Sequence, residues 1–510
     1  MSYFGTTATL IVALLLAGIT KLLFKRKAQT TSYAPGPKPK PLIGNLLDIP
    51  SKHAARVFAR WGKTYNSDIL FASTLGNHIL VLNKLEDVEE LLDRRSRIYS
   101  DRQVVPMMKL MGWDHNIGLL QYGDKWRVHR KICQQNFNAR AALDYQPMIK
   151  SKINDLLQGL LVSPERFEEH NKTFSTSIPL ASMYGYDVDT LDHQWVKLAD
   201  ESLLMGAKLL LPGASLINVF PFLQHIPEWF PGASTRRTAG EVKKLTDYLI
   251  KSPFDWVKKR MQEGMSVPSL VTNYLESKGK DATPEDEIIV SDIAYSIYVG
   301  ASDTTISLGL TFLYLMTIHP EIQKKAQAEI DRVTGGSRLP DFEDRSSLPY
   351  IEAMYRELMR WMPPVPLGLP HRLTEDDEYK GYFIPKGTAV MANIWAMSRD
   401  EERYPEPHLF KPERFLDENG EINDDDHILA FGFGRRICVG KHVATHIIWM
   451  MITSIIAAFD VSKAKDNFGN DIEIEDDYTD YGALLHKSSF KCSIKPRSAA
   501  ARELILEKEN

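Results

Sequence analysis

The hydrophobic pattern is most pronounced at the start of the chain. From Tyr3 to Phe24, about 22 residues are apolar or small apart from Lys21, a length that is about enough to cross the hydrocarbon core of a bilayer. The basic run 25–27 follows at once and no charge precedes the segment, so we expect the bulk of the chain to be cytoplasmic. A cleaved signal peptide is the alternative, but it normally carries its positive charges before the apolar run. Residues 1–27 are therefore predicted to be a membrane anchor.

Prolines at high density mark residues 28–50, in the run Pro35-Gly-Pro-Lys-Pro-Lys-Pro41. Such a run does not form a helix and favours an extended, semi-rigid spacer. After residue 50, no Gly/Ser linker, repeat or low-complexity tract divides the sequence. We therefore expect residues 51–510 to form one large, mostly helical unit, with the acidic run 471–480 and the tail after Pro496 as solvated surface.

A helical pattern extends from Thr283 to Ile318. Thr283 suits the N-cap, a proline and three acidic residues follow it, and His319-Pro320 predicts the end. In the middle of this apolar helix, Asp303 and Thr304 stand side by side. Such a polar pair is costly unless it meets water or a ligand, although a core helix with a satisfied polar kink would also explain it.

Charge and cysteine content exclude several classes of function. The net charge is −4, from 62 basic and 66 acidic residues, so nothing suggests a nucleic-acid partner. Three cysteines without a paired pattern argue against a disulfide framework and for a reducing compartment. Asn171-Lys-Thr173 matches a glycosylation acceptor, which a cytoplasmic domain would not use.

One cysteine has unusual neighbours, in the run Phe431-Gly-Phe-Gly-Arg-Arg-Ile-Cys-Val-Gly440. Gly434 and Gly440 flank Cys438, and glycines permit positive φ values and a close approach of backbone amides to the sulfur. Positive charge and backbone N–H groups hold a metal-binding thiolate deprotonated, and Arg436 could reach a haem propionate. A buried, inert cysteine is the alternative. The number of fixed positions around Cys438 argues against that alternative.

This run has the pattern F-x-x-G-x-R-x-C-x-G, and the sequence resembles the cytochrome P450 family along almost its whole length. The resemblance implies a mainly α fold with a smaller β region, the cytochrome P450 fold, on an N-terminal transmembrane helix. It also implies heme b as the cofactor, with iron bound by the Cys438 thiolate and with Phe431, Arg436 and Gly440 around it.

Two further motifs bear on the haem through the resemblance. Trp126 and Arg130 are four residues apart, so they share one helix face, and the family places both over the haem propionates. A solvated basic helix with one buried Trp is the alternative. His371 would also meet a propionate, although a lone histidine is more often a surface or satisfied residue.

The resemblance implies roles for the polar pair and for a charged cluster. Thr304 would hydrogen-bond the oxygen that is activated, and Asp303 would relay protons to it. A triad of Glu357, Arg360 and Arg414 would be buried beneath the haem, where each charge must be paired; a surface pair is the alternative for the first two. A lipophilic cavity would be lined by the stretches 104–118 and 203–211, which are rich in Met and Leu, and by Val365, Pro366, Leu367 and Leu369.

The implied function is a haem-thiolate monooxygenase that inserts one oxygen atom from O2 into a lipophilic small molecule. Electrons would come from NADPH through NADPH–cytochrome P450 reductase, with cytochrome b5 as a further candidate. A basic patch would suit an acidic electron donor, formed by Arg127, Arg130, Lys131, Arg435 and Lys441. The anchor implies the endoplasmic reticulum membrane, crossed once.

In detail, segments 229–232 and 393–400 resemble fungal microsomal members of the O-methylsterigmatocystin oxidoreductase type. The substrate is therefore expected to be a fungal secondary metabolite, a terpenoid first and a polyketide or indole next. Alternatives are a haem-thiolate isomerase, dehydratase or peroxygenase, which would not need the Asp303-Thr304 pair, and a non-catalytic haem-binding sensor.

Overall fold

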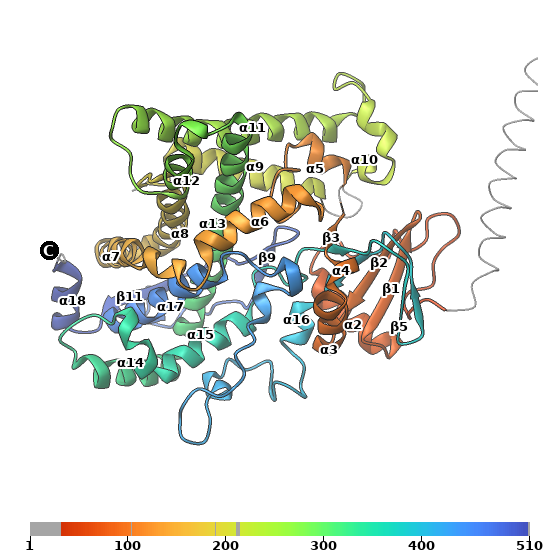
Figure 1. Cartoon of the computed structure of the whole chain (residues 1–510). Coiled ribbons are helices and arrows are strands. Elements are labelled where there is room, and N and C mark those ends of the chain that lie inside the picture. The colour runs from red at the N-terminus through yellow and green to blue at the C-terminus, as the bar shows by residue number, and fades with distance from the viewer. Residues whose placement is uncertain (1–31, 104, 189, 211–214, 508–510) are drawn as a thin grey trace, which may run out of the picture.

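The structure, a computed structural model, describes residues 32–103, 105–188, 190–210 and 215–507, and helices form most of it (Figure 1). The predicted anchor lies outside these residues. The α-helices of the described ranges are α2 (Ala54–Tyr65), α3 (Leu85–Val88), α4 (Ser96–Tyr99), α5 (Pro106–Leu110), α6 (Asp124–Phe137), α7 (Gln146–Val162), α8 (Phe167–Tyr184), α9 (Gln194–Leu210), α10 (Leu216–Val219), α11 (Ser234–Gln262), α12 (Leu270–Lys278), α13 (Pro284–Ile318), α14 (Pro320–Thr334), α15 (Pro349–Trp361), α16 (Ile394–Met397), α17 (Lys441–Ala458) and α18 (Ala499–Leu506).

A smaller β region lies beside the helices. The strands of the described residues are β1 (Ile69–Thr74), β2 (Asn77–Leu82), β3 (Asp101–Arg102), β4 (His371–Arg372), β5 (Asp377–Tyr379), β6 (Tyr382–Ile384), β7 (Ala389–Ala392), β8 (Phe459–Lys463), β9 (Tyr478–Asp480), β10 (Leu485–Lys487) and β11 (Cys492–Pro496). The main sheet has the order β1-β2-β7-β4-β3. Only its β2–β7 pair is parallel, with Ile79 opposite Ala389. Figure 1 shows this sheet with α2 to α4 at one side of the molecule and α7, α14, α17 and α18 at the other.

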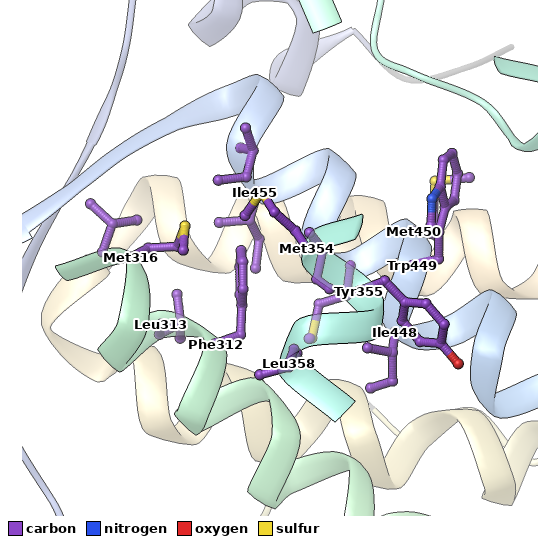
Figure 2. Close-up of a cluster of buried hydrophobic side chains, with 14 of the residues drawn as sticks. Phe312, Leu313, Met316, Met354, Tyr355, Leu358, Ile448, Trp449, Met450 and Ile455 are labelled. Carbon is purple, nitrogen blue, oxygen red and sulfur yellow. The ribbon is translucent and has the colours of Figure 1, made fainter. Parts of the chain in front are cut away.

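Three helices meet in the main hydrophobic core. Figure 2 shows side chains of α13, α15 and α17 packed together, among them Phe312, Tyr355 and Trp449. All three are almost fully buried. A large apolar area is removed from water here, which is the main favourable contribution to folding. The core therefore fixes two helices of the candidate site. Helix α13 carries Asp303 and Thr304, and α17 begins directly after the loop that contains Cys438.

Helix α13 confirms the prediction made for residues 283–318. The Thr283 hydroxyl accepts a hydrogen bond from the Asp286 N–H, and the Asp286 carboxylate accepts one from the Thr283 N–H, which together form a capping box. Lys278 and Thr283 hold the pKa of Asp286 below its ordinary value, first through the hydrogen bond from Lys278. The helix ends at Ile318.

Among the described residues, one helix is long and apolar enough to cross a membrane by length and composition, the stretch Lys441–Ala458 that forms α17. Of this stretch, 67% is buried, and every residue from Ile447 to Ala458 lies in the interior. Because its surface contacts protein on all sides along that length, α17 is a core helix.

The segments predicted as spacer and tail both contact the domain. Pro35 accepts a hydrogen bond from the Phe71 N–H of β1 at 2.8 Å, so this part of the proline-rich stretch lies along the sheet. The expectation of a fully solvated tail is wrong, because α18 buries Ala501 and Ile505. The spacing of these apolar residues is helical, and it gives the tail one face to pack.

Asn171 is 2% exposed and lies on α8, where it faces α13. Its side-chain amide donates to the Ile306 carbonyl at 3.0 Å, and a Cβ added at Gly309 would overlap the Asn171 side chain. The glycosylation motif is therefore a structural contact between two helices.

Candidate functional site

The loop before α17 presents Cys438. The Cys438 N–H donates to the Phe431 carbonyl at 2.8 Å, which closes the loop between them. Gly434 has φ +59°, and an added Cβ would overlap the Leu92 carbonyl, so this position requires glycine as the sequence suggested. At Gly440 the explanation by a positive φ is wrong, because the φ of this residue is −90°. There a Cβ would meet no atom within 4 Å, and the residue borders open space.

Cys438 is exposed to solvent, whereas Cys133 is buried. The surrounding protein nevertheless raises the pKa of the Cys438 thiol, chiefly by desolvation. The Gly440 N–H, Arg130 and Lys441 act in the opposite direction on the pKa, and they would stabilise a thiolate. The donor set therefore suits a soft sulfur ligand for iron.

Helix α6 reaches this loop through the two predicted residues. Trp126 is buried, and the Arg436 guanidinium lies over its ring, 4.5 Å from the centroid. One helical turn further, Arg130 Nη1 donates to the Ile437 carbonyl at 2.6 Å. Residues three hundred positions apart in the sequence thus meet beside Cys438.

Arg436 and His371 are held on the other side by strand β3 and its flanks. Arg436 donates to the Ser100 carbonyl at 2.7 Å and to the Leu120 carbonyl at 2.8 Å. His371 Nδ1 donates to the Tyr99 carbonyl at 2.8 Å. The second ring nitrogen, Nε2, is therefore the one that remains for a ligand. Both side chains are therefore oriented by backbone groups and not by carboxylates.

Arg102 of β3 is a further cation that the sequence analysis missed. It is buried and donates to the Gly118 carbonyl at 3.0 Å and to the Leu369 carbonyl. A single arginine outside any motif gives no signal in the sequence. Only the pairing of β3 with β4 brings Arg102 opposite His371.

The cluster carries excess positive charge. The pKa of Arg102 is lowered to about 9, first by burial and then by the charge of Arg436. Burial also lowers the pKa of Arg436 to about 10. The pKa of His371 lies well below 6.5, first because of burial and then because of Arg102. Asp101 opposes the first two shifts. In addition, Arg130 Nε and Arg436 Nη1 are buried without a hydrogen bond to any described group. Buried cations and unused donors in this arrangement suit an anionic group such as a pair of carboxylates, so the residues fit haem propionates.

Helix α13 carries the predicted acid and hydroxyl. The Thr304 hydroxyl donates to the Gly300 carbonyl one turn earlier at 3.0 Å. A Cβ at Gly300 would meet no atom within 4 Å, so α13 has free space at this turn. Oδ1 of Asp303 lies 3.2 Å from Nε2 of His486 on β10, a contact that the sequence analysis did not predict.

The predicted charged triad is confirmed as a buried cluster. Arg360 makes two hydrogen bonds to the Glu357 carboxylate, at 2.6 and 2.7 Å, and Arg414 makes one at 3.1 Å. The side chains of Glu357 and Arg360 are 0% and 2% exposed. Backbone carbonyls satisfy the remaining donors, among them those of Ser398 and Pro407.

Two groups predicted from composition are arranged differently from the expectation. The segments 104–118 and 203–211, as far as they are described, pack against each other in one hydrophobic cluster that includes Met107, Met111 and Leu209. Of the basic residues proposed as a surface patch, Arg127, Lys131 and Arg435 are exposed. Arg130 instead points inward to the cysteine loop, so it does not belong to that surface.

Comparison with known proteins identifies the class. The family model for Cytochrome P450 matches residues 34–493. Curated relatives include Cytochrome P450 monooxygenase COX2 of Coprinopsis cinerea, 40% identical over 93% of this chain and 91% of that protein. They also include the monooxygenases ple1 of Rhodocybe pseudopiperita (37% identical, 96% and 94% covered) and claR of Ampulloclitocybe clavipes (37% identical, 93% and 88% covered).

The chain belongs to the cytochrome P450 family. It is a haem-thiolate monooxygenase, in agreement with the names of its relatives and with the cysteine loop described above.

Proposed function

We propose that this monooxygenase inserts one oxygen atom into a lipophilic secondary metabolite, with Cys438 as the iron ligand and Asp303 and Thr304 as the groups that move protons. The observation that carries the site assignment is the convergence of Arg436, Trp126 and Arg130 beside the cysteine loop. Two motifs that are far apart in the sequence meet there, and each supplies groups that suit haem.

The cationic cluster would hold the two propionates of the haem. Arg436, Arg130 and Arg102 would supply the charge and the donors, and Trp126 would supply an apolar ring beside them. His371 would donate through Nε2 once a nearby propionate favours its protonated form. Phe431 and Gly440 bracket the cysteine through a carbonyl and an N–H. When bound through the Cys438 thiolate, haem supplies oxygen-activating chemistry, because the thiolate pushes electron density that favours O–O cleavage.

The acid and hydroxyl of α13 supply the protons that oxygen reduction consumes. Asp303 is 20% exposed, so it can exchange protons with water and still contact groups inside the helix bundle. Within the described ranges, the Thr304 hydroxyl bonds one group, a backbone carbonyl of its own helix, and it can turn to donate elsewhere. A carboxyl group next to a hydroxyl forms a short relay of the kind used in general acid catalysis.

A terpenoid is the first substrate class to test, with polyketides and indoles next. The open space beside Gly300 on α13, one turn before Thr304, leaves room for a bulky ligand next to the proton-relay pair.

The electron donor is proposed to be NADPH–cytochrome P450 reductase, with cytochrome b5 as a second candidate donor. Exposed Arg127, Lys131 and Arg435 support docking of an acidic partner on the cysteine side. We also propose attachment to the endoplasmic reticulum membrane through residues 1–27, with the domain cytoplasmic. A patch of exposed apolar side chains around α10 supports contact with a lipid surface, formed by Leu216, Phe220, Phe222, Trp229 and Phe230.

Isotope labelling tests the reaction. The haem-loaded protein, reductase and NADPH are incubated under ¹⁸O2 with a panel of terpenes, polyketides and indoles. The proposal predicts that a product gains one labelled oxygen in an NADPH-dependent manner. A product formed without the label would indicate an isomerase or dehydratase. A product formed with hydrogen peroxide but not with NADPH and reductase would indicate a peroxygenase. A protein that binds haem but forms no product would be a sensor.

A further inference from the structure

A histidine from the β9–β10 hairpin contacts the proton-relay acid. Nε2 of His486 lies 3.2 Å from Oδ1 of Asp303, and the two side chains are 12% and 20% exposed. Among the residues that the structure describes, Nε2 of His486 has no hydrogen bond of good geometry. The contact with Asp303 is thus the polar interaction that this nitrogen makes.

The hairpin is fixed against α13, so the contact does not depend on a free side chain alone. The Ser307 hydroxyl, one turn after Asp303, donates to the Leu485 carbonyl at 2.5 Å, and the Leu485 N–H donates to Pro364 at 3.0 Å. The Tyr481 ring packs edge-on against the His486 imidazole, with centroids 5.3 Å apart. These contacts place the imidazole against the helix at the turn of Asp303.

The other charges near Asp303 explain why a basic side chain is useful as its partner. Asp200 of α9 interacts electrostatically with Asp303, which contributes to the raised pKa of Asp200, although burial is the larger cause. Lys172 of α8 pairs with Asp200 and offsets its charge. His486 occupies the corresponding position for Asp303 on the hairpin side, so each carboxylate has one basic partner.

We propose that His486 is a positioning residue for Asp303: it holds the carboxylate against the hairpin, next to Thr304, in the orientation from which Asp303 delivers protons. The inference rests on the proposed role of Asp303. It connects the hairpin to oxygen activation, because a movement of β10 would move the acid.

The test uses the haem-loaded protein with His486→Leu, His486→Gln, Asp303→Asn and the double variant Asp303→Asn/His486→Leu. The first readout is independent of activity, namely the thermal unfolding midpoint of the ferric protein. If the two side chains interact, the losses in the single variants are not additive, and His486→Leu costs little once Asp303 is already Asn. Additive losses would overturn the proposal.

The second readout is NADPH oxidation with reductase in the absence of added substrate, in H2O and in D2O. We expect His486→Leu to slow NADPH oxidation about tenfold and to increase the solvent isotope effect. A tenfold loss is the smaller end of what removal of a group that orients a functional ligand usually causes. His486→Gln keeps a side-chain N–H donor and is expected to stay within about twofold of the wild type. Leu484→Ala, on the same hairpin, is the matched control and should leave the isotope effect unchanged.

The outcomes separate the two claims. If Asp303→Asn slows NADPH oxidation and His486→Leu does not change the rate or the isotope effect, the role of His486 is wrong and that of Asp303 stands. If Asp303→Asn itself has no effect, the proposed proton relay is wrong and the positioning role falls with it.

Discussion

Arg436 stacks on Trp126, with its guanidinium carbon 4.5 Å from the ring centroid. A cation–π contact of this kind contributes about 0.5–2 kcal/mol, depending on how far it is desolvated. Its greater importance is geometric, because it joins the cysteine loop to α6. The same arginine bonds the backbone on both sides of β3, so one side chain ties together three parts of the site.

Arg102 should matter for haem binding more than for folding. Burial lowers its pKa to about 9, so its charge is unfavourable in the fold unless an anion is near. We expect Arg102→Gln, which keeps a donor for one of the two carbonyls, to weaken haem affinity about tenfold. The measurement is haem transfer from the holoprotein to an excess of an apo-acceptor protein. The exposed Arg97, replaced in the same way, is the control, and equal haem retention in both variants would contradict the assignment.

Thr304→Ala should separate electron consumption from product formation. The variant loses the hydroxyl next to Asp303, so proton delivery is impaired, and reduced oxygen leaves as peroxide. We expect hydrogen peroxide formed per NADPH to rise several-fold while haem content stays normal. Ser302→Ala is the control, because Ser302 also bonds a carbonyl one turn earlier in α13. A peroxide yield that rises equally in both variants would show that helix distortion and not the Thr304 hydroxyl is responsible.

Glu357→Ala should strongly destabilise the fold. It leaves Arg360 and Arg414 without their carboxylate in a buried place, and such a loss costs about 3–5 kcal/mol. Asp247→Ala on α11 breaks an exposed pair with Lys243 and should cost at most about 1 kcal/mol. Urea unfolding of the haem-loaded proteins measures both. A small loss for Glu357→Ala would mean that the triad is not closed in solution.

The stability of the protein should depend on pH through His115. Burial lowers the pKa of His115 below 6.5, against the opposing effect of Asp292. The unfolded chain then binds a proton more readily than the folded one, so stability is unaffected above about pH 6.5 and falls below it, by up to about 1.4 kcal/mol per pH unit.

Urea midpoints at pH 7.5 and 5.5 measure this effect. His115→Gln should lose less stability between the two pH values than the wild type, and the exposed His225→Gln should behave as the wild type does. An identical loss in the wild type and His115→Gln would show that His115 does not titrate as described.

Motifs and periodic patterns predicted the parts of the molecule that depend on local sequence. The cap at Thr283 and the end at Ile318 are set by the residues next to them, and α13 has these bounds. The contacts of Glu357 with Arg360 and Arg414 were also predictable from the sequence, because two short motifs in a known order define these residues.

Other features depend on contacts between distant segments and gave no local signal. Arg102 joins the cationic cluster through strand pairing, and His486 reaches Asp303 only because β10 packs on α13. The inward turn of Arg130 has the same origin, since its partner is a carbonyl three hundred residues away. Exposure of a charged residue on a helix is likewise decided by what packs against that helix.

The most direct test of the central claim is the absorption spectrum of the reduced protein with carbon monoxide, for the wild type, Cys438→His and Cys133→Ser. Thiolate ligation predicts a strongly red-shifted Soret band in the wild type and in Cys133→Ser, and its loss in Cys438→His. An ordinary imidazole-type band in the wild type, or a red-shifted band that persists in Cys438→His, would contradict the assignment of Cys438 as the iron ligand.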